Sequence, residues 1–209
     1  MGFVTLVPVV AMGYLLGSFP SGYLVARLWG INVLKLGSGR TGGTNVFRYA
    51  GILPALLTGA LDISKGALAV WLAAQLTAFP TAQALAGGAA ILGHNYSLFL
   101  HFRGGAGVGT SLGALGVIYL PAAVALVLVL LIVIAVTRYA SVGSLTVTTL
   151  MPILLMVLGI SGTLSLAYVG YGLLAWVLIV YAHLPNIRRL LTGTERRLGE
   201  KAPLHTGAD

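Results

Sequence analysis

The sequence has no cysteine and very few acidic residues. Without cysteine the chain forms no disulfide and carries no thiol nucleophile, and its redox compartment stays open. Only 4 Asp and Glu stand against 12 Lys and Arg, with 4 His. This supply is too small for a paired-carboxylate site or a His/Asp/Glu metal cluster, and no Ser–His–Asp set is evident. We therefore expect no metal, and any chemistry must rely on binding and electrostatic stabilisation of anionic groups.

Charge of either sign is scarce, because 8% of the residues are charged and 58% are hydrophobic. The mean hydropathy is +0.98, and apolar stretches of about 20 residues recur, which excludes a soluble domain and predicts a polytopic helical membrane protein. The net charge of +8 comes from cations at the ends of these stretches. That placement follows the positive-inside rule, so we expect membrane lipid and no nucleic acid as partners. The N-terminus lacks a basic region, so the first span is predicted to be retained.

Hydropathy predicts five clear spans and one longer apolar region. The spans cover residues 4–28, 51–78, 81–102, 142–160 and 164–181, and the longer region covers 108–136. Read as one helix, that region would be roughly 44 Å long at 1.5 Å per residue, which is long even for a tilted span. Pro121 divides it instead into a short helix at 108–119 and a second at 122–137.

The distribution of cations between the two membrane faces supports the division at Pro121. If the region holds two helices, one membrane face carries a large set of cations: Arg27, Lys35, Arg40, Arg48, Arg103, Arg138, Arg188, Arg189, Arg196, Arg197 and Lys201. The opposite connections, near 79–82, 120 and 161–163, have no Lys or Arg. This asymmetry predicts seven crossings, with the N-terminus outside and the C-terminus in the cytoplasm.

The predicted fold is thus an all-α integral membrane protein, a seven-helix transmembrane bundle with one short helix. A helix of about 12 residues cannot cross the ~30 Å hydrocarbon core unaided, so we expect it inside the bundle beside a polar cavity. Residues 1–209 are predicted to form a single domain with a polar cytoplasmic tail from about 184.

The stretch 35–48, KLGSGRTGGTNVFR, is polar, glycine-rich and cationic between apolar neighbours. Glycines let the backbone turn tightly and present N–H groups, and arginines add charge, which together suit a phosphate. The candidate ligands here are Ser38, Gly39, Arg40, Thr44, Asn45 and Arg48. The alternative is a solvated loop whose charges set topology.

A second glycine-rich stretch, 93–111, turns from one helix into the start of the next. A helix N-terminus preceded by glycines binds anions well, and the candidates are Arg103, Gly104, Gly105, Gly107 and Thr110. It superficially resembles a Walker A loop, but Thr110 stands where that motif requires Lys, so we reject nucleotide binding. The alternative is a tight interfacial turn.

Two further polar groups lie near the C-terminal ends of predicted spans. The first contains Arg138 and Ser141. In the second, His183 and Asn186 are spaced i, i+3 and share a helix face if the helix passes Pro185. Arg189 and Glu195 follow as supporting residues, and His94 supports from the second stretch. The alternative for both groups is ordinary snorkelling at helix ends.

Asp62 and Lys65 lie inside the second predicted span at i, i+3 spacing. An intramembrane ion pair is costly unless it is paired and partly hydrated, so both side chains should face the bundle. Two interpretations remain: a site wall or proton-transfer element, and a structural pair that locks the helix to the polar loops.

These motifs, in this order, resemble the PlsY family of bacterial integral-membrane glycerol-3-phosphate acyltransferases. The resemblance runs over nearly the whole chain through short matches: LLGSFPSGY at 15–23, GSG and GGTNV within 37–46, LD and KG within 61–66, FRGG at 102–105, TRY at 137–139, and H, N, RLL and GTE within 183–195.

The resemblance implies acyl transfer from acyl-phosphate to the sn-1 hydroxyl of glycerol-3-phosphate. The products would be lysophosphatidic acid and phosphate for phospholipid synthesis, without coenzyme A, metal or another cofactor. It also implies a bacterial inner-membrane location, with an active site facing the cytoplasm and no dedicated protein base. By motif match, the residues expected to hold the substrate phosphates are Ser38, Arg48, Ser141, His183 and Asn186.

The chain departs from the family pattern at several motif positions. Arg40 replaces Asn, Gly43 replaces Ala, Arg103 replaces Lys, Ala106 replaces a second Lys, and Ser97 replaces Pro. A lysine that binds phosphate contributes about 1.5–3 kcal/mol, which Ala106 would lose. We hypothesise that Arg40 restores this charge from the facing loop.

Three other functions are compatible with parts of the pattern. The first alternative is a family member with an altered substrate or weak activity. The second is a small-anion or lipid transporter, and the third is a membrane protein without a site. Transport would need polar gates on both faces, and the predicted outer face has no charge. Five clustered polar motifs argue against the siteless alternative.

Overall fold

The computed structural model describes residues 3–200, and over that range it is all-helical apart from one isolated bridge between Ser97 and Arg103. The α-helices are α1 (Phe3–Ser18), α2 (Ser21–Leu28), α3 (Gly43–Ala50), α4 (Ile52–Leu76), α5 (Pro80–Asn95), α6 (Val108–Ile118), α7 (Leu120–Thr137), α8 (Ala140–Ile160) and α9 (Ala167–Leu191). Two short 3₁₀ helices, η1 (Val33–Lys35) and η2 (Leu98–Leu100), lie in the connections.

Five segments are long and apolar enough to cross a membrane. They are Leu6–Leu28, Ile52–Leu76, Leu120–Thr137, Ala140–Ile160 and Ala167–Leu191. The predicted all-α membrane class is therefore confirmed.

The predicted division of the long apolar region is also confirmed, because α6 ends at Ile118 and α7 begins at Leu120. Pro121 lies in the first turn of α7, where proline is tolerated because that N–H has no helical partner.

The predicted span at 4–28 agrees with the span at Leu6–Leu28, but it is made of two helices. The helix breaks at Phe19 and Pro20, between α1 and α2. Proline cannot donate to the preceding turn and disfavours helical geometry in the residue before it. Lys65 Nζ lies 3.1 Å from the Phe19 carbonyl oxygen that the break leaves accessible, so a buried cation satisfies that carbonyl.

Three predicted boundaries were wrong. The helix expected at 81–102 ends at Asn95, and the chain turns through His101 and Phe102, both with positive φ. The tail expected from 184 begins later, because α9 continues through Pro185 to its end. Part of the stretch expected to be a loop is the helix α3.

The short helix α6 is held inside the bundle by close backbone contact with α4. A Cβ on Gly66 would lie 2.0 Å from the Thr110 carbonyl oxygen, and one on Gly113 would lie 2.0 Å from that of Ile63. Only glycine permits these approaches. The main cluster of buried apolar residues draws on α4 to α9, with α6 among them.

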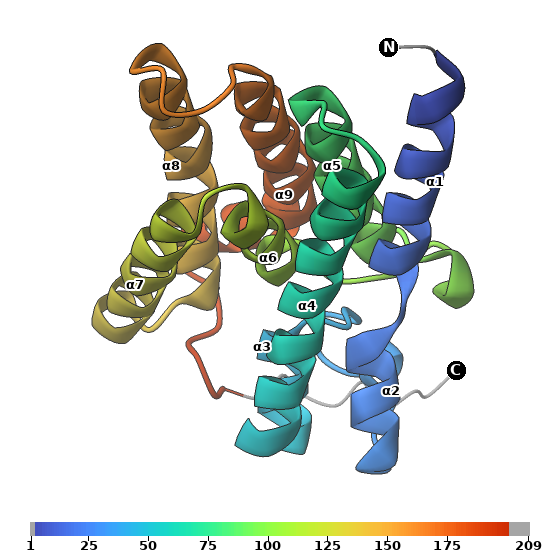
Figure 1. The fold of residues 1–209 in the computed structure, drawn as a ribbon. Coiled ribbons are helices and arrows are strands. Elements are labelled where there is room, and N and C mark those ends of the chain that lie inside the picture. Colours follow the sequence, from blue (N-terminus) through green and yellow to red (C-terminus); the bar gives the residue numbers. More distant parts are fainter. Residues whose placement is uncertain (1–2, 201–209) are drawn as a thin grey trace.

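Figure 1 shows α2, α3 and the segment after α9 together at one end of the bundle, and the α8–α9 connection at the other. We call the first the loop end. The candidate site lies at this end, where the polar segments from distant parts of the sequence meet.

Candidate active site

Asn45, in the first turn of α3, organises the loop before it. Its side-chain nitrogen donates to three backbone carbonyls, those of Val33, Leu36 and Arg40, at 3.2, 3.1 and 2.9 Å. Its side-chain oxygen accepts from the Ser38 backbone N–H at 3.4 Å. Gly37 and Gly39 have φ of 61° and 67°, a left-handed conformation that glycine adopts readily. The buried Asn45 amide thus fixes the loop that places Ser38 and Arg40.

A cavity of about 240 Å³ opens between this loop, α3, α4, the start of α6, and α7, α8 and α9. We call it the main cavity. The predicted phosphate-binding residues that line it are Ser38, Arg40, Thr44, Asn45, Arg48, Gly107, Ser141, His183 and Asn186. The predicted supporting residues that line it are Asp62, His94, Arg189 and Glu195. The structure therefore brings residues of all five polar motifs to one place.

Arg48 brings a buried positive charge to the main cavity. The residue is 9% exposed, and its guanidinium donates to the Arg196 carbonyl oxygen at 3.4 Å, while its buried Nε has no hydrogen-bond partner. Burial, followed by the nearby Arg196 charge, lowers the pKa of Arg48. A buried cation whose N–H donor has no hydrogen-bond partner favours an anionic ligand.

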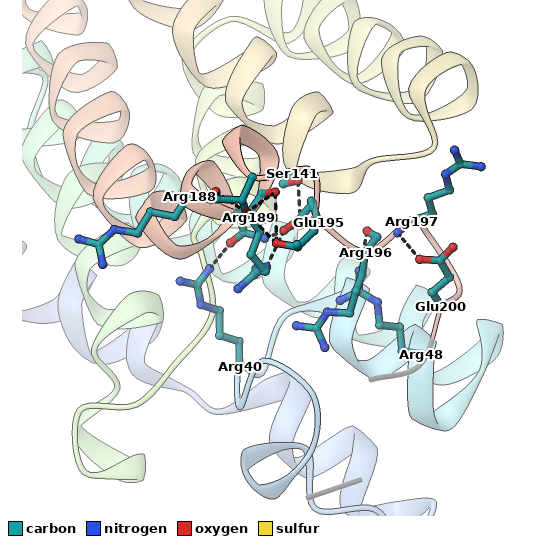
Figure 2. Close-up of polar contacts among 12 residues, drawn as sticks. Arg40, Arg48, Ser141, Arg188, Arg189, Glu195, Arg196, Arg197 and Glu200 are labelled. Carbon is teal, nitrogen blue, oxygen red and sulfur yellow. Dashed lines mark hydrogen bonds and ion pairs between the residues drawn. The ribbon is translucent and has the colours of Figure 1, made fainter. Parts of the chain in front are cut away.

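Glu195 gathers the polar groups of α8 and α9 (Figure 2). One carboxylate oxygen accepts from Ser141 Oγ at 3.0 Å and Asn186 Nδ2 at 2.8 Å, and the other accepts from Arg189 Nε at 2.7 Å. Burial alone would raise the pKa of Glu195, but the hydrogen bonds from Asn186, Arg189 and Ser141 and the Arg189 charge hold it below its ordinary value. Glu195 is therefore a buried carboxylate that orients these donors.

His183 lies on the same face of α9 as Asn186, as predicted, because the helix continues past Pro185. His183 Nδ1 is 2.8 Å from the Ile179 carbonyl oxygen. A carbonyl only accepts, so Nδ1 carries the hydrogen and Nε2 is the acceptor of the neutral ring.

A second polar network lies deeper, between α2, α4 and α5. Asp62 accepts from Ser21 Oγ at 2.6 Å, pairs with Lys65 Nζ at 3.1 Å, and lies 3.4 Å from His94 Nδ1. The predicted Asp62–Lys65 ion pair is thus present and buried. Asp62 and His94 face the main cavity, whereas Lys65 lines an apolar groove beside α1.

The remaining predicted residues lie outside the main cavity. Gly39, Arg103, Gly104 and Gly105 line a neighbouring second cavity of about 260 Å³. Thr110 is fully buried beneath α4. Arg138 ends α7 with φ of 62°, and its carbonyl accepts from the Leu198 N–H at 2.6 Å.

The main cavity also has lining residues that the motifs did not indicate. Ser144 lies one turn beyond Ser141 on α8, and this i, i+3 spacing could have revealed it. Leu130 and Ile134 come from α7, an uninterrupted apolar helix whose sequence does not mark one face. Among residues 3–200, no three His, Cys, Asp or Glu gather where they could hold a metal ion.

Comparison with known proteins identifies the family. A family model described as glycerol-3-phosphate acyltransferase matches residues 7–193. The chain belongs to the glycerol-3-phosphate acyltransferase family. Two members of this family, each named glycerol-3-phosphate acyltransferase, illustrate the similarity. The protein from Synechococcus sp. (strain CC9902) is 42% identical over 92% of this chain and 94% of its own length. A protein from Thermus thermophilus is 45% identical over 91% of this chain and 94% of its own length.

The fold agrees with a solved member of the family. A crystal structure of PlsY (YgiH), described as an integral membrane glycerol 3-phosphate acyltransferase in its glycerol 3-phosphate form, superposes with a TM-score of 0.84. It is 34% identical, and the match covers 93% of this chain and 96% of that one. The family resemblance recognised from the motifs is therefore confirmed.

Replacing Glu195 by Gln should destabilise the protein in a pH-dependent way. Because the pKa of Glu195 is depressed in the folded state, its stabilisation is present above the pKa of the unfolded carboxyl and is lost as pH falls through the folded pKa. We expect Glu195→Gln to lower the free energy of unfolding by about 1–3 kcal/mol at pH 7, with the difference shrinking below about pH 4.

Thermal unfolding in detergent between pH 4 and 8 measures this difference. Glu200→Gln is the matched control, because Glu200 is exposed and its carboxylate accepts from the Arg197 backbone N–H outside the cavity. A Glu195→Gln variant as stable as the parent at pH 7 would contradict the assigned role of the carboxylate.

Proposed function

We propose that the protein transfers an acyl group from an acyl-phosphate to the sn-1 hydroxyl of glycerol-3-phosphate, releasing inorganic phosphate. The product, lysophosphatidic acid, enters phospholipid synthesis. The observation that carries this proposal is Arg48, a buried guanidinium with an unpartnered Nε in a cavity lined by short polar donors. Both proposed substrates carry a phosphate, and guanidinium groups bind phosphate through charge-assisted hydrogen bonds.

The walls of the main cavity suit a ligand with a charged head and an apolar chain. The loop and α9 supply the polar side, while Leu130 and Ile134 of α7 supply an apolar side. The start of α6, from Ala106 to Gly109, also lines the cavity. Backbone N–H groups in the first turn of a helix have no intrahelical acceptor and stabilise negative charge. Their proposed role is to stabilise the charge that develops on an acyl carbonyl oxygen under attack.

In the proposed reaction, the glycerol-3-phosphate hydroxyl oxygen forms a bond to the acyl carbon, and the bond from that carbon to the phosphate oxygen breaks. A substrate phosphate accepts the hydroxyl proton, so no residue is assigned as the catalytic base. Inorganic phosphate leaves with the bonding electron pair. The protein contributes by placing two charged substrates together and by stabilising negative charge.

We assign the proposed roles by position. Ser38, Arg48, Ser141, His183 and Asn186 bind phosphate, with Arg40, Thr44 and Gly107 beside them in the main cavity, and Gly39, Arg103, Gly104 and Gly105 contribute from the second cavity. Asn45 and Thr110 are assigned to shaping the loop and the start of α6. The supporting residues are Asp62, Lys65, His94, Arg138, Arg189 and Glu195.

We further propose a single domain of seven crossings in the bacterial inner membrane, with the N-terminus outside and the loop end in the cytoplasm. The crossings are α1 with α2, then α4, α5, α6, α7, α8 and α9. Support comes from the cations of the loop end and from the burial of α6, which is too short to cross unaided but is packed against α4.

Activity is tested with purified protein, palmitoyl-phosphate and glycerol-3-phosphate, by measuring phosphate release. We expect release that requires both substrates. Arg48→Ala should lower kcat/KM about 10- to 100-fold, because it removes a charged hydrogen-bond donor to phosphate. Arg27→Ala, an exposed arginine on α2, is the matched control. Equal rates in Arg48→Ala, or no release by folded parent protein, would reject the proposal.

Orientation is tested by single-cysteine labelling, which the cysteine-free sequence allows without prior substitutions. Thr163→Cys, in the exposed α8–α9 connection, should react with an impermeant maleimide in intact cells. Lys35→Cys, exposed at the loop end, should react only after the membrane is permeabilised. The reverse pattern would contradict the proposed orientation.

A further inference from the structure

Arg40 stands between two cavities. Among the described residues, it is the one that lines both the main cavity, of about 240 Å³, and the second cavity, of about 260 Å³. The other residues that line the second cavity belong to the loop, to the end of α5 and the α5–α6 connection, and to α9. A ligand in either cavity therefore meets the same guanidinium.

The contacts of Arg40 hold it across this boundary. One terminal nitrogen donates to Asn186 Oδ1 at 3.4 Å, and the other donates to the Ala182 carbonyl oxygen. Asn186 lines the main cavity and Ala182 lines the second. Figure 2 shows Arg40 reaching from its loop toward α9. Because a guanidinium has five N–H donors, several remain for ligands on either side.

The same contact sets the orientation of Asn186. With Oδ1 accepting from Arg40, the Nδ2 group turns toward Glu195 and donates to it at 2.8 Å. Arg40 thus fixes one face of the main cavity as well as its boundary.

Few other charges are available to balance two phosphates. Arg189 is already paired with Glu195 at 2.7 Å. Ala106, in the wall of the main cavity, contributes no charge. Among the described residues, Arg40 and Arg48 have no ion pair with a carboxylate, and Arg103 is the other arginine in the second cavity. Two phosphate groups brought together here would repel each other unless a cation lies between them.

We propose that the two substrates place one phosphate in each cavity, on either side of Arg40, and that Arg40 binds and neutralises both. This inference rests on the proposed function and deepens it. It makes Arg40 the residue that allows the two anions to occupy the site together. Without it, the binding of one substrate weakens the binding of the other.

The test compares Arg40→Gln, which removes the charge, with Arg40→Lys, which keeps it. KM for each substrate is measured at several fixed concentrations of the other. We expect Arg40→Gln to raise both KM values about tenfold or more, and each KM to increase further as the other substrate is raised. Arg40→Lys keeps the charge but has three donors in place of five, so both KM values should rise less than in Arg40→Gln.

Ala106→Lys supplies a second, independent measurement. Ala106 lines the main cavity and is not among the residues that line the second. Added to Arg40→Gln, the new lysine should restore the KM of one substrate and leave that of the other raised. Rescue of both KM values, or of neither, would contradict the placement of one phosphate on each side of Arg40.

Arg188→Gln is the matched control. Arg188 is an exposed arginine of α9 that lines neither cavity and points away from Glu195 in Figure 2. The KM values of Arg188→Gln should therefore be those of the parent.

If Arg40→Gln raises neither KM or only one, or if Arg40→Lys raises KM as much as Arg40→Gln, the inference is rejected and the proposed function stands. If folded parent protein has no activity, the proposed function is rejected and this inference with it.

Discussion

The candidate site depends on the Glu195 carboxylate, because it allows several arginines to face one small cavity. The chain has 12 Lys and Arg but only 4 Asp and Glu, so cations outnumber the carboxylates that could neutralise them. Glu195 neutralises Arg189 and at the same time orients Ser141 and Asn186. The other two arginines of the main cavity, Arg40 and Arg48, then carry the charge available to a ligand. An uneven distribution of very few negative charges thus leaves a cavity whose charge suits an anion.

Backbone carbonyl oxygens, as well as carboxylates, hold cations near the site. The break at Pro20 leaves the Phe19 carbonyl open to Lys65, which also pairs with Asp62, and Arg40 donates to the Ala182 carbonyl of α9. A broken or distorted helix exposes carbonyl oxygens that an intact helix would use internally. The sequence thus combines apolar helices with a local break at Pro20 that anchors one cation near the site.

Local patterns predicted the features that depend on residues close in sequence. The Asp62–Lys65 pair follows from i, i+3 spacing, and the division at Pro121 follows from the length of the apolar region. The long-range features had no such signal. The left-handed backbone at Phe102 falls on a bulky residue that rarely adopts it, so the sequence did not mark this turn. The role of Asn45 in binding three loop carbonyls, and the boundary formed by Arg40, arise only when distant segments meet.

The most direct measurement is a crystal structure of the protein determined with glycerol-3-phosphate. The central claim is that the arginine-lined cavities of the loop end bind the phosphate groups of the substrates. It predicts a phosphate at the loop end, with oxygens about 2.7–2.9 Å from guanidinium nitrogens of Arg40. A phosphate bound away from both cavities, or cavities that stay empty at saturating ligand, would contradict it.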